Sequence, residues 1–157
     1  MKNALRTLSL LSFSAVALFL VWFGVTYLRA ETMLWFHAAA VPEDVRDDVL
    51  PLYRALMNLI GGASASLGAI GLYVVWGPLR SGAHLAGAAL FASFTAALAV
   101  AAVTAEDLAA ATGAPTSWHI MGVLMALAAA AFAAGLFGYS TPRKTATSLA
   151  SSPRSAA

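Results

Sequence analysis

The chain alternates between long apolar runs and shorter polar segments. The apolar runs extend over residues 8–28, 52–76, 83–104 and 117–138. Each is about as long as a helix must be to cross a bilayer, roughly 20 residues. None shows the strict apolar–polar alternation that is typical of strands in a membrane β-barrel. The pattern therefore predicts an all-α fold, built as a bundle of four transmembrane helices.

The composition supports a membrane environment. Hydrophobic residues make up 61% of the 157 residues and charged residues only 10%, whereas soluble domains carry about 25% charged residues. The formal charge of +2 is small and the basic residues are scattered, so no nucleic-acid partner is expected. The chain has no cysteine, which excludes disulfides, thiolate metal ligands and a cysteine nucleophile.

The charged residues separate into two groups when the four apolar runs are treated as membrane spans. One side would hold only basic residues: Lys2, Arg6, Arg80, Arg143, Lys144 and Arg154. The other would hold every acidic residue of the chain: Glu31, Glu43, Asp44, Asp47, Asp48, Glu106 and Asp107. Lys and Arg accumulate in cytoplasmic loops. We therefore predict an antiparallel bundle in the cell inner (cytoplasmic) membrane, with both termini cytoplasmic.

The first apolar run also has the basic flank of a secretory signal peptide. It is longer than the apolar core of such a peptide, which has about 7–15 residues. We therefore expect it to be retained as the first membrane span, with cleavage near Ala30 as the alternative.

The segments outside the predicted spans differ in character. Residues 29–51 form the longest, an acidic loop expected on the non-cytoplasmic side. Its stretch ETMLWFHAAA contains good helix formers, so we expect the first helix to continue past the membrane surface until Pro42. Residues 141–157 are rich in Ser, Thr, Pro and Ala, and we expect a disordered cytoplasmic tail. The membrane domain is then residues 1–140.

Small residues recur at four-residue spacing in three of the runs, and such lines allow close helix contact in lipid. They are Gly61, Ala65 and Ala69 in the second run, Ala89, Ser93, Ala97 and Ala101 in the third, and Gly122, Ala126, Ala130, Ala134 and Gly138 in the fourth. We interpret these lines as packing faces within the chain, with homodimerisation as the alternative.

Polar residues that indicate a ligand site gather at the acidic, non-cytoplasmic ends of the spans. Arg54 and Asn58 are four residues apart and share one face of a helix. The predicted ligand-binding residues are Arg54, Asn58, Glu106, Asp107, Trp118, His119 and His37. A structural alternative is that Arg54 pairs with Asp47, Asp48, Glu106 or Asp107 to hold the loops. No nucleophile, base and acid form a recognisable set, so no catalytic residue is predicted.

His37 and His119 raise a second alternative, a shared metal or haem site. Two neutral imidazoles can bind haem iron, and a four-helix bundle is a suitable frame. Neither histidine belongs to a metal-binding motif such as HExxH. His119 also follows Thr116 and Ser117, either of which can cap the fourth helix, and Trp118 suits an interfacial aromatic belt. We therefore expect no metal or cofactor, with haem b or quinone as the alternative.

The stretch LYRALMNLIGGASASLGAIGLY, residues 52–73, resembles the second span of DoxX-like small membrane proteins. The similarity consists of an arginine near the start of the span, then a glycine pair, then Leu-Gly. It is carried by Arg54, Gly61, Gly62, Leu67 and Gly68. The resemblance implies a four-span fold and little about chemistry.

Together these patterns predict an integral membrane protein that is structural, accessory or binds a small ligand, and that is not an enzyme. The absence of Asp and Glu from the spans argues against a transporter that couples to ions through buried carboxylates. The alternatives are a redox subunit that binds haem or quinone near His37 and His119, and a small oligomeric transporter. The expected partners are the lipid bilayer and either a second copy of the chain or another membrane protein.

Overall fold

The computed structural model describes residues 2–139, and this part of the chain is helical without any strand. Its elements are α1 (Lys2–Leu28), α2 (Trp35–Ala38), the 3-10 helix η1 (Glu43–Val45), α3 (Arg46–Val74), the π-helix η2 (Val75–Leu79), α4 (His84–Thr112) and α5 (His119–Gly138). Within residues 2–139, four helical segments are long and apolar enough to cross a membrane. The all-α class is thereby confirmed, as is the prediction of four helices long and apolar enough to cross a membrane. The predicted tail, residues 141–157, lies outside the described residues.

The first helix does not continue as far as Pro42, so that prediction is wrong. α1 ends at Leu28, and the next helical residues are the four of α2. The backbone between them finds partners on α3 instead: Arg54 donates to the Glu31 carbonyl, and the Tyr53 hydroxyl accepts the Leu34 N–H. These contacts compete with helical hydrogen bonds, and good helix formers alone do not decide the outcome.

The second span is longer than its apolar run. α3 begins at Arg46, well before the predicted start at residue 52, and carries Pro51 inside its first turns. A proline there forfeits only one helical hydrogen bond, and Asp47 and Asp48 favour the positive end of the helix. The last part of the predicted acidic loop, residues 46–51, is therefore the start of a helix.

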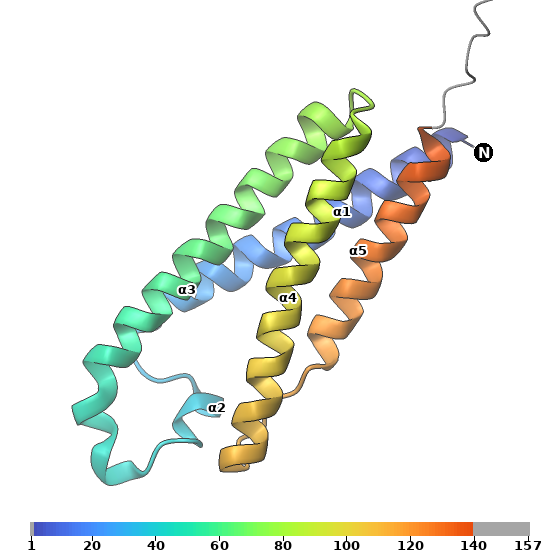
Figure 1. Cartoon of the computed structure of the whole chain (residues 1–157). Helices are drawn as coiled ribbons and strands as arrows, with labels where there is room; N and C mark the ends of the chain where they lie inside the picture. The colour runs from blue at the N-terminus through green and yellow to red at the C-terminus, as the bar shows by residue number, and fades with distance from the viewer. Residues whose placement is uncertain (1, 140–157) are drawn as a thin grey trace, which may run out of the picture.

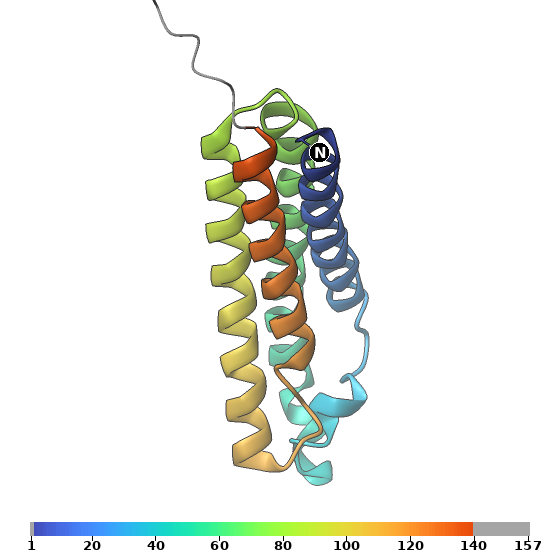
Figure 2. The same ribbon diagram turned by 90° about the vertical axis from the view of Figure 1, so that its right-hand side faces the viewer.

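The helices do not pack in the order of the sequence. α1 packs against α3 on one side and α5 on the other, and α5 packs against α4. Figure 2 shows α5 between α4 and α1. α3 and α4 follow each other in the chain but touch little. The start of α1, the α3–α4 turn and the end of α5 lie at one end of the molecule, and α2 and the α4–α5 connection lie at the other (Figure 1).

α1 and α3 meet backbone to backbone along a line of glycines. A Cβ added to Gly24 would lie 2.4 Å from the Ala65 nitrogen and 2.5 Å from the Gly61 oxygen. One added to Gly68 would lie 2.6 Å from the Ala17 oxygen. Such close approach gives helices in lipid the contact area that holds them together. We name this contact the α1–α3 seam.

The predicted small-residue lines are only partly packing faces. In α5, Ala134 is buried and Gly138 closes on the Arg6 backbone, but Ala126 and Ala130 are exposed. In α4 the buried positions include Leu90, Phe94 and Leu98, whereas Ala89 and Ser93 of the predicted line are exposed. An alanine-rich helix carries small residues on every face, so four-residue spacing does not identify the face that packs.

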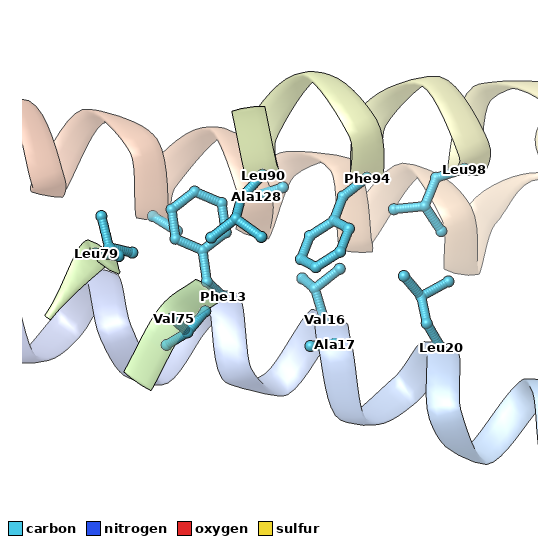
Figure 3. Close-up of a cluster of buried hydrophobic side chains, with 11 residues drawn as sticks. Phe13, Val16, Ala17, Leu20, Val75, Leu79, Leu90, Phe94, Leu98 and Ala128 are labelled. Carbon is cyan, nitrogen blue, oxygen red and sulfur yellow. The ribbon is translucent and has the colours of Figure 1, made fainter. Parts of the chain in front are cut away.

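The main hydrophobic core lies between α1, η2, α4 and α5. Figure 3 shows Phe13, Val16 and Leu20 of α1 pointing toward Phe94 and its neighbours on α4. The rings of Phe13 and Phe94 meet edge to face, with centroids 6.3 Å apart. The cluster consists of Phe13, Val16, Ala17, Leu20, Val75, Leu79, Leu90, Phe94, Leu98, Ala128 and Ala131.

Candidate functional site

Tyr53 of α3 anchors the first loop. Its hydroxyl accepts the backbone N–H of Leu34 at 3.1 Å and lies 2.9 Å from Nδ1 of His37. A phenol has one proton to donate, which fits a neutral imidazole that accepts it at Nδ1. Burial lowers the pKa of the half-buried His37, which favours the same neutral form. His37 therefore acts here as part of a docked loop.

Aromatic rings surround His37. The centroid of Phe36 lies 4.4 Å from that of the imidazole, Tyr53 lies at 5.5 Å and Tyr27 at 6.0 Å. All three meet it at steep angles, which is a favourable geometry for aromatic pairs. This packing explains why the imidazole of His37 is half-buried.

Two arginines of α3 hold the loop by its main chain. Arg46 donates from Nε to the Val41 carbonyl at 3.1 Å and from Nη2 to the Ala38 carbonyl at 2.9 Å. Arg54 donates from Nε to the Glu31 carbonyl at 2.7 Å, and its Nη2 donates to the same oxygen. The predicted ion pair of Arg54 with Asp47, Asp48, Glu106 or Asp107 is therefore wrong. Both arginines hold the loop through carbonyl oxygens and not through these carboxylates.

Arg54 and Asn58 also line an open recess, as their shared helix face suggests. The recess has a volume of about 400 Å³ and is lined by Leu28, Ala30, Glu31, Arg54 and Asn58. Within residues 2–139, no hydrogen bond involves the side chain of Asn58 or the carboxylate of Glu31. Arg54 uses part of its guanidinium on the Glu31 carbonyl. Asn58, Glu31 and the partly used Arg54 thus line one space.

The other predicted residues lie in or beside the α4–α5 connection. Thr116 donates from Oγ1 to the Ala105 carbonyl at 2.6 Å, and the Trp118 N–H donates to Oε1 of Glu106 at 3.3 Å. The Ser117 hydroxyl accepts the N–H of His119 at 3.3 Å and also contacts its Nδ1. Of the two predicted caps, Ser117 is the one that bonds the first turn of α5. A carboxylate at a helix start is favourable, so Glu106 has a structural role here.

His37 and His119 belong to separate clusters. The contacts of His37 are with Tyr27, Phe36 and Tyr53. His119 contacts Ser117 and stacks on Trp118, with ring centroids 4.8 Å apart. Residues 2–139 contain no group of three or more His, Cys, Asp or Glu side chains that could hold a metal ion. The seven predicted residues therefore divide into a recess pair, a helix-start group and a docked loop histidine, while Asp107 is exposed on α4.

Three further residues shape this end and are not among the predicted ones: Glu31, Arg46 and Tyr53. Tyr53 directly precedes Arg54, so the sequence predicts its position near the start of the second span. Its partner His37 is 16 residues away, and no local spacing connects the two. Glu31 contributes its carbonyl oxygen, and sequence patterns carry no information about carbonyl acceptors.

A second hollow lies inside the bundle and differs in chemistry. Its volume is about 130 Å³, and its lining comes from all four long helices. The lining is formed by Phe19, Leu20, Phe23, Ala63, Ser64, Leu67, Ala97, Leu98, Ala101 and Met121. This apolar cavity shares no residue with the recess. It suits hydrocarbon, while the recess suits a polar group.

Known proteins add no further guide to this site. No protein-family model matches the chain, and neither a curated protein nor a solved structure matches it.

Proposed function

We propose that this multi-pass membrane protein is a non-enzymatic bundle that binds a small zwitterionic ligand in the recess between α1 and α3. The observation that carries the proposal is the placement of Arg54, Asn58 and Glu31 around one space of about 400 Å³. Ligand sites for small molecules measure about 300–1,000 Å³, so the recess has a suitable size.

The lining residues define the chemistry of the ligand. A guanidinium has five N–H donors, and Arg54 directs only its Nε and Nη2 to the Glu31 carbonyl. The remaining donors match a phosphate or carboxylate oxygen. The Glu31 carboxylate accepts an ammonium group, and the Asn58 amide both donates and accepts. A ligand that carries one negative and one positive group satisfies all three.

We propose that the bundle is antiparallel, with both termini cytoplasmic and the recess on the non-cytoplasmic side of the cytoplasmic membrane. Arg6 and Arg80 meet at one end, and all acidic residues lie in segments of the other, which fits the positive-inside rule. Because the chain has no cysteine, Ser81→Cys and Thr112→Cys each supply a single labelling site. A membrane-impermeant maleimide should label them from opposite sides. Labelling from the same side would contradict the four-span arrangement.

The relationship to DoxX-like proteins remains a proposal. It is supported by the roles of the residues that carry the resemblance. Gly61 and Gly68 are buried in the α1–α3 seam, and Arg54 lines the recess. Haem or quinone binding is not proposed, because no observation brings His37 and His119 to one site.

Phosphoethanolamine is a suitable probe for the recess, since it carries a phosphate and an ammonium group on a short chain. We expect the purified protein to bind it in a saturation-transfer NMR titration. Arg54→Gln should weaken binding about tenfold or more, the value of a hydrogen bond to a charged group. Glu31→Gln should weaken phosphoethanolamine but leave binding of inorganic phosphate unchanged.

Two control variants separate loss of the recess from loss of the loop. Asp107→Asn removes an exposed carboxylate at the same end that does not line the recess, and it should bind like the wild type. Arg46→Gln loosens the loop without touching the recess. Equal binding by wild type and Arg54→Gln would contradict the proposal, as would an Arg46→Gln variant as weak as Arg54→Gln.

A further inference from the structure

The end of the molecule opposite the recess brings two arginines together. Arg6 of α1 donates from Nη2 to the backbone carbonyl of Arg80, which follows η2. The Arg6 guanidinium carbon lies 5.1 Å from the ring centroid of Tyr139, and that of Arg80 lies 5.9 Å from the ring centroid of Trp76. Each cation is thus positioned by an aromatic face. We name this pair the arginine clamp.

The local sequence explains the position of Arg80. Pro78 has no N–H, and its ring would clash with the Val74 carbonyl in a regular α-helix. The helix widens there into η2, where the N–H of Arg80 bonds the Val75 carbonyl at 3.1 Å. Gly82, at φ 96°, then reverses the chain toward α4. The widened turn therefore ends with Arg80 beside the start of α1.

The close approach of α5 fixes Arg6 from the other side. A Cβ on Gly138 would lie 2.8 Å from the Arg6 nitrogen, so only glycine admits this contact. Tyr139 follows directly, and its ring also meets His84 edge to face, with centroids 6.1 Å apart. Three segments of the chain thus converge on the arginine clamp.

Within residues 2–139, no acidic side chain lies at the clamp end of the molecule. All seven acidic residues fall between positions 31 and 107, in the first loop, the start of α3 and the last turns of α4, at the opposite end (Figure 1). Both guanidinium groups therefore lie at the end of the molecule that the acidic residues do not reach. An anion that binds there would supply the missing negative charge.

The surroundings indicate the source of that anion. Trp76 is 50% exposed and Tyr73 75% exposed, and Leu85 presents an apolar side chain just after the turn. These residues belong to or adjoin two of the candidate membrane spans. Guanidinium groups bind phosphate oxygens in a bidentate manner, and basic sites between membrane helices bind anionic lipid head groups. We propose that the arginine clamp binds the phosphodiester of an anionic phospholipid. Arg6 and Arg80 are the two residues that donate hydrogen bonds to its phosphate oxygens.

The test uses the full-length protein in detergent, with dioleoyl phosphatidylglycerol as the probe and native mass spectrometry as the measurement. A basic residue near a membrane surface contributes about 1 kcal/mol, so Arg6→Gln and Arg80→Gln should each lower the affinity about fivefold. The double variant should lower it about 25-fold. Arg29→Gln, an exposed arginine beyond the other end of α1, should leave it unchanged.

A second variant keeps the test meaningful if the glutamine variants fold poorly. Arg6→Lys with Arg80→Lys retains both charges but loses bidentate geometry, and it should weaken binding about threefold or more. Inorganic phosphate at millimolar concentration should not displace the lipid. Wild-type affinity in either double variant would overturn the clamp, and displacement by phosphate alone would overturn the assignment to a lipid. The clamp lies at the opposite end from the recess, so this result is independent of the proposed function.

Discussion

α3 is held by two kinds of contact, one along the α1–α3 seam and one to the first loop. In the seam, backbone meets backbone, and glycines at positions 24, 61 and 68 leave no space for a side chain. At the loop, side chains of Arg46, Tyr53 and Arg54 bond main-chain groups between Glu31 and Val41. The middle of α3 is thus held by close backbone packing, and its first turns are held by hydrogen bonds.

The difference follows from the two solvents. Lipid gives helices no hydrophobic reason to associate, so close packing decides whether they do. Water competes for every polar contact of the loop, and each such hydrogen bond has a net value of about 1 kcal/mol. The seam should therefore respond to a single added methyl group. The loop should open locally while the bundle stays folded.

The largest effect is expected from one methyl group placed in the seam. Gly24→Ala adds a Cβ that would lie 2.4 Å from the backbone of Ala65, so α1 and α3 must move apart. We expect the free energy of unfolding to fall by about 2–3 kcal/mol, as in other overpacked interiors. Thermal unfolding of the purified protein in detergent micelles, followed by circular dichroism, measures the change.

Gly62→Ala is the matched control, because it adds the same methyl group to the same helix pair. A Cβ at Gly62 meets nothing within 4 Å. Alanine is the better helix former by about 0.5–1 kcal/mol, so this variant should be as stable as the wild type or more so. Equal stability of the Gly24 and Gly62 variants would contradict the view that shape holds the seam.

The features that can be predicted from the sequence are those that separate the apolar helices from the polar ends. Runs of uncharged residues identify the four spans, and the segregation of acidic residues identifies the two ends. The α1–α3 seam is predicted only in part. Gly61 and Ala65 belong to the predicted line of small residues in the second apolar run, whereas Gly24 and Gly68 do not. Small residues are so frequent in these helices that period alone does not select the contacting face. Selection depends on bulky partners such as Phe94, which contacts Gly71 from another helix.

The candidate site is predicted less well, for a different physical reason. Arg54 and Asn58 share a helix face, and local spacing is sufficient to predict that. The partner of Arg54 is a carbonyl 23 residues away, and carbonyls are present at every residue. A charged side chain therefore suggests a carboxylate partner from sequence, although a main-chain oxygen near the end of a helix is equally able to accept.

The smallest effect is expected at the loop, from the protonation of His37. Burial lowers the pKa of His37 in the docked loop, whereas an undocked loop has the ordinary value of about 6.5. Above pH 6.5 the imidazole is neutral in both states, and docking is unaffected. Below it the undocked state takes up a proton first, so docking weakens until the pH falls below the pKa of the docked imidazole. Hydrogen-exchange protection of the Leu34 amide should therefore decline from pH 6.5 toward pH 5.

Two substitutions separate the imidazole from its hydrogen bond. His37→Phe keeps the aromatic contacts but does not titrate, so protection should no longer depend on pH in this window. Tyr53→Phe removes the acceptor of the Leu34 N–H, so protection should fall at every pH. The decline below pH 6.5 should remain, because burial and not the hydroxyl lowers the pKa. A decline that persists in His37→Phe would contradict the assignment of the pH dependence to His37, and docking of the loop would then not depend on the neutral form of this imidazole.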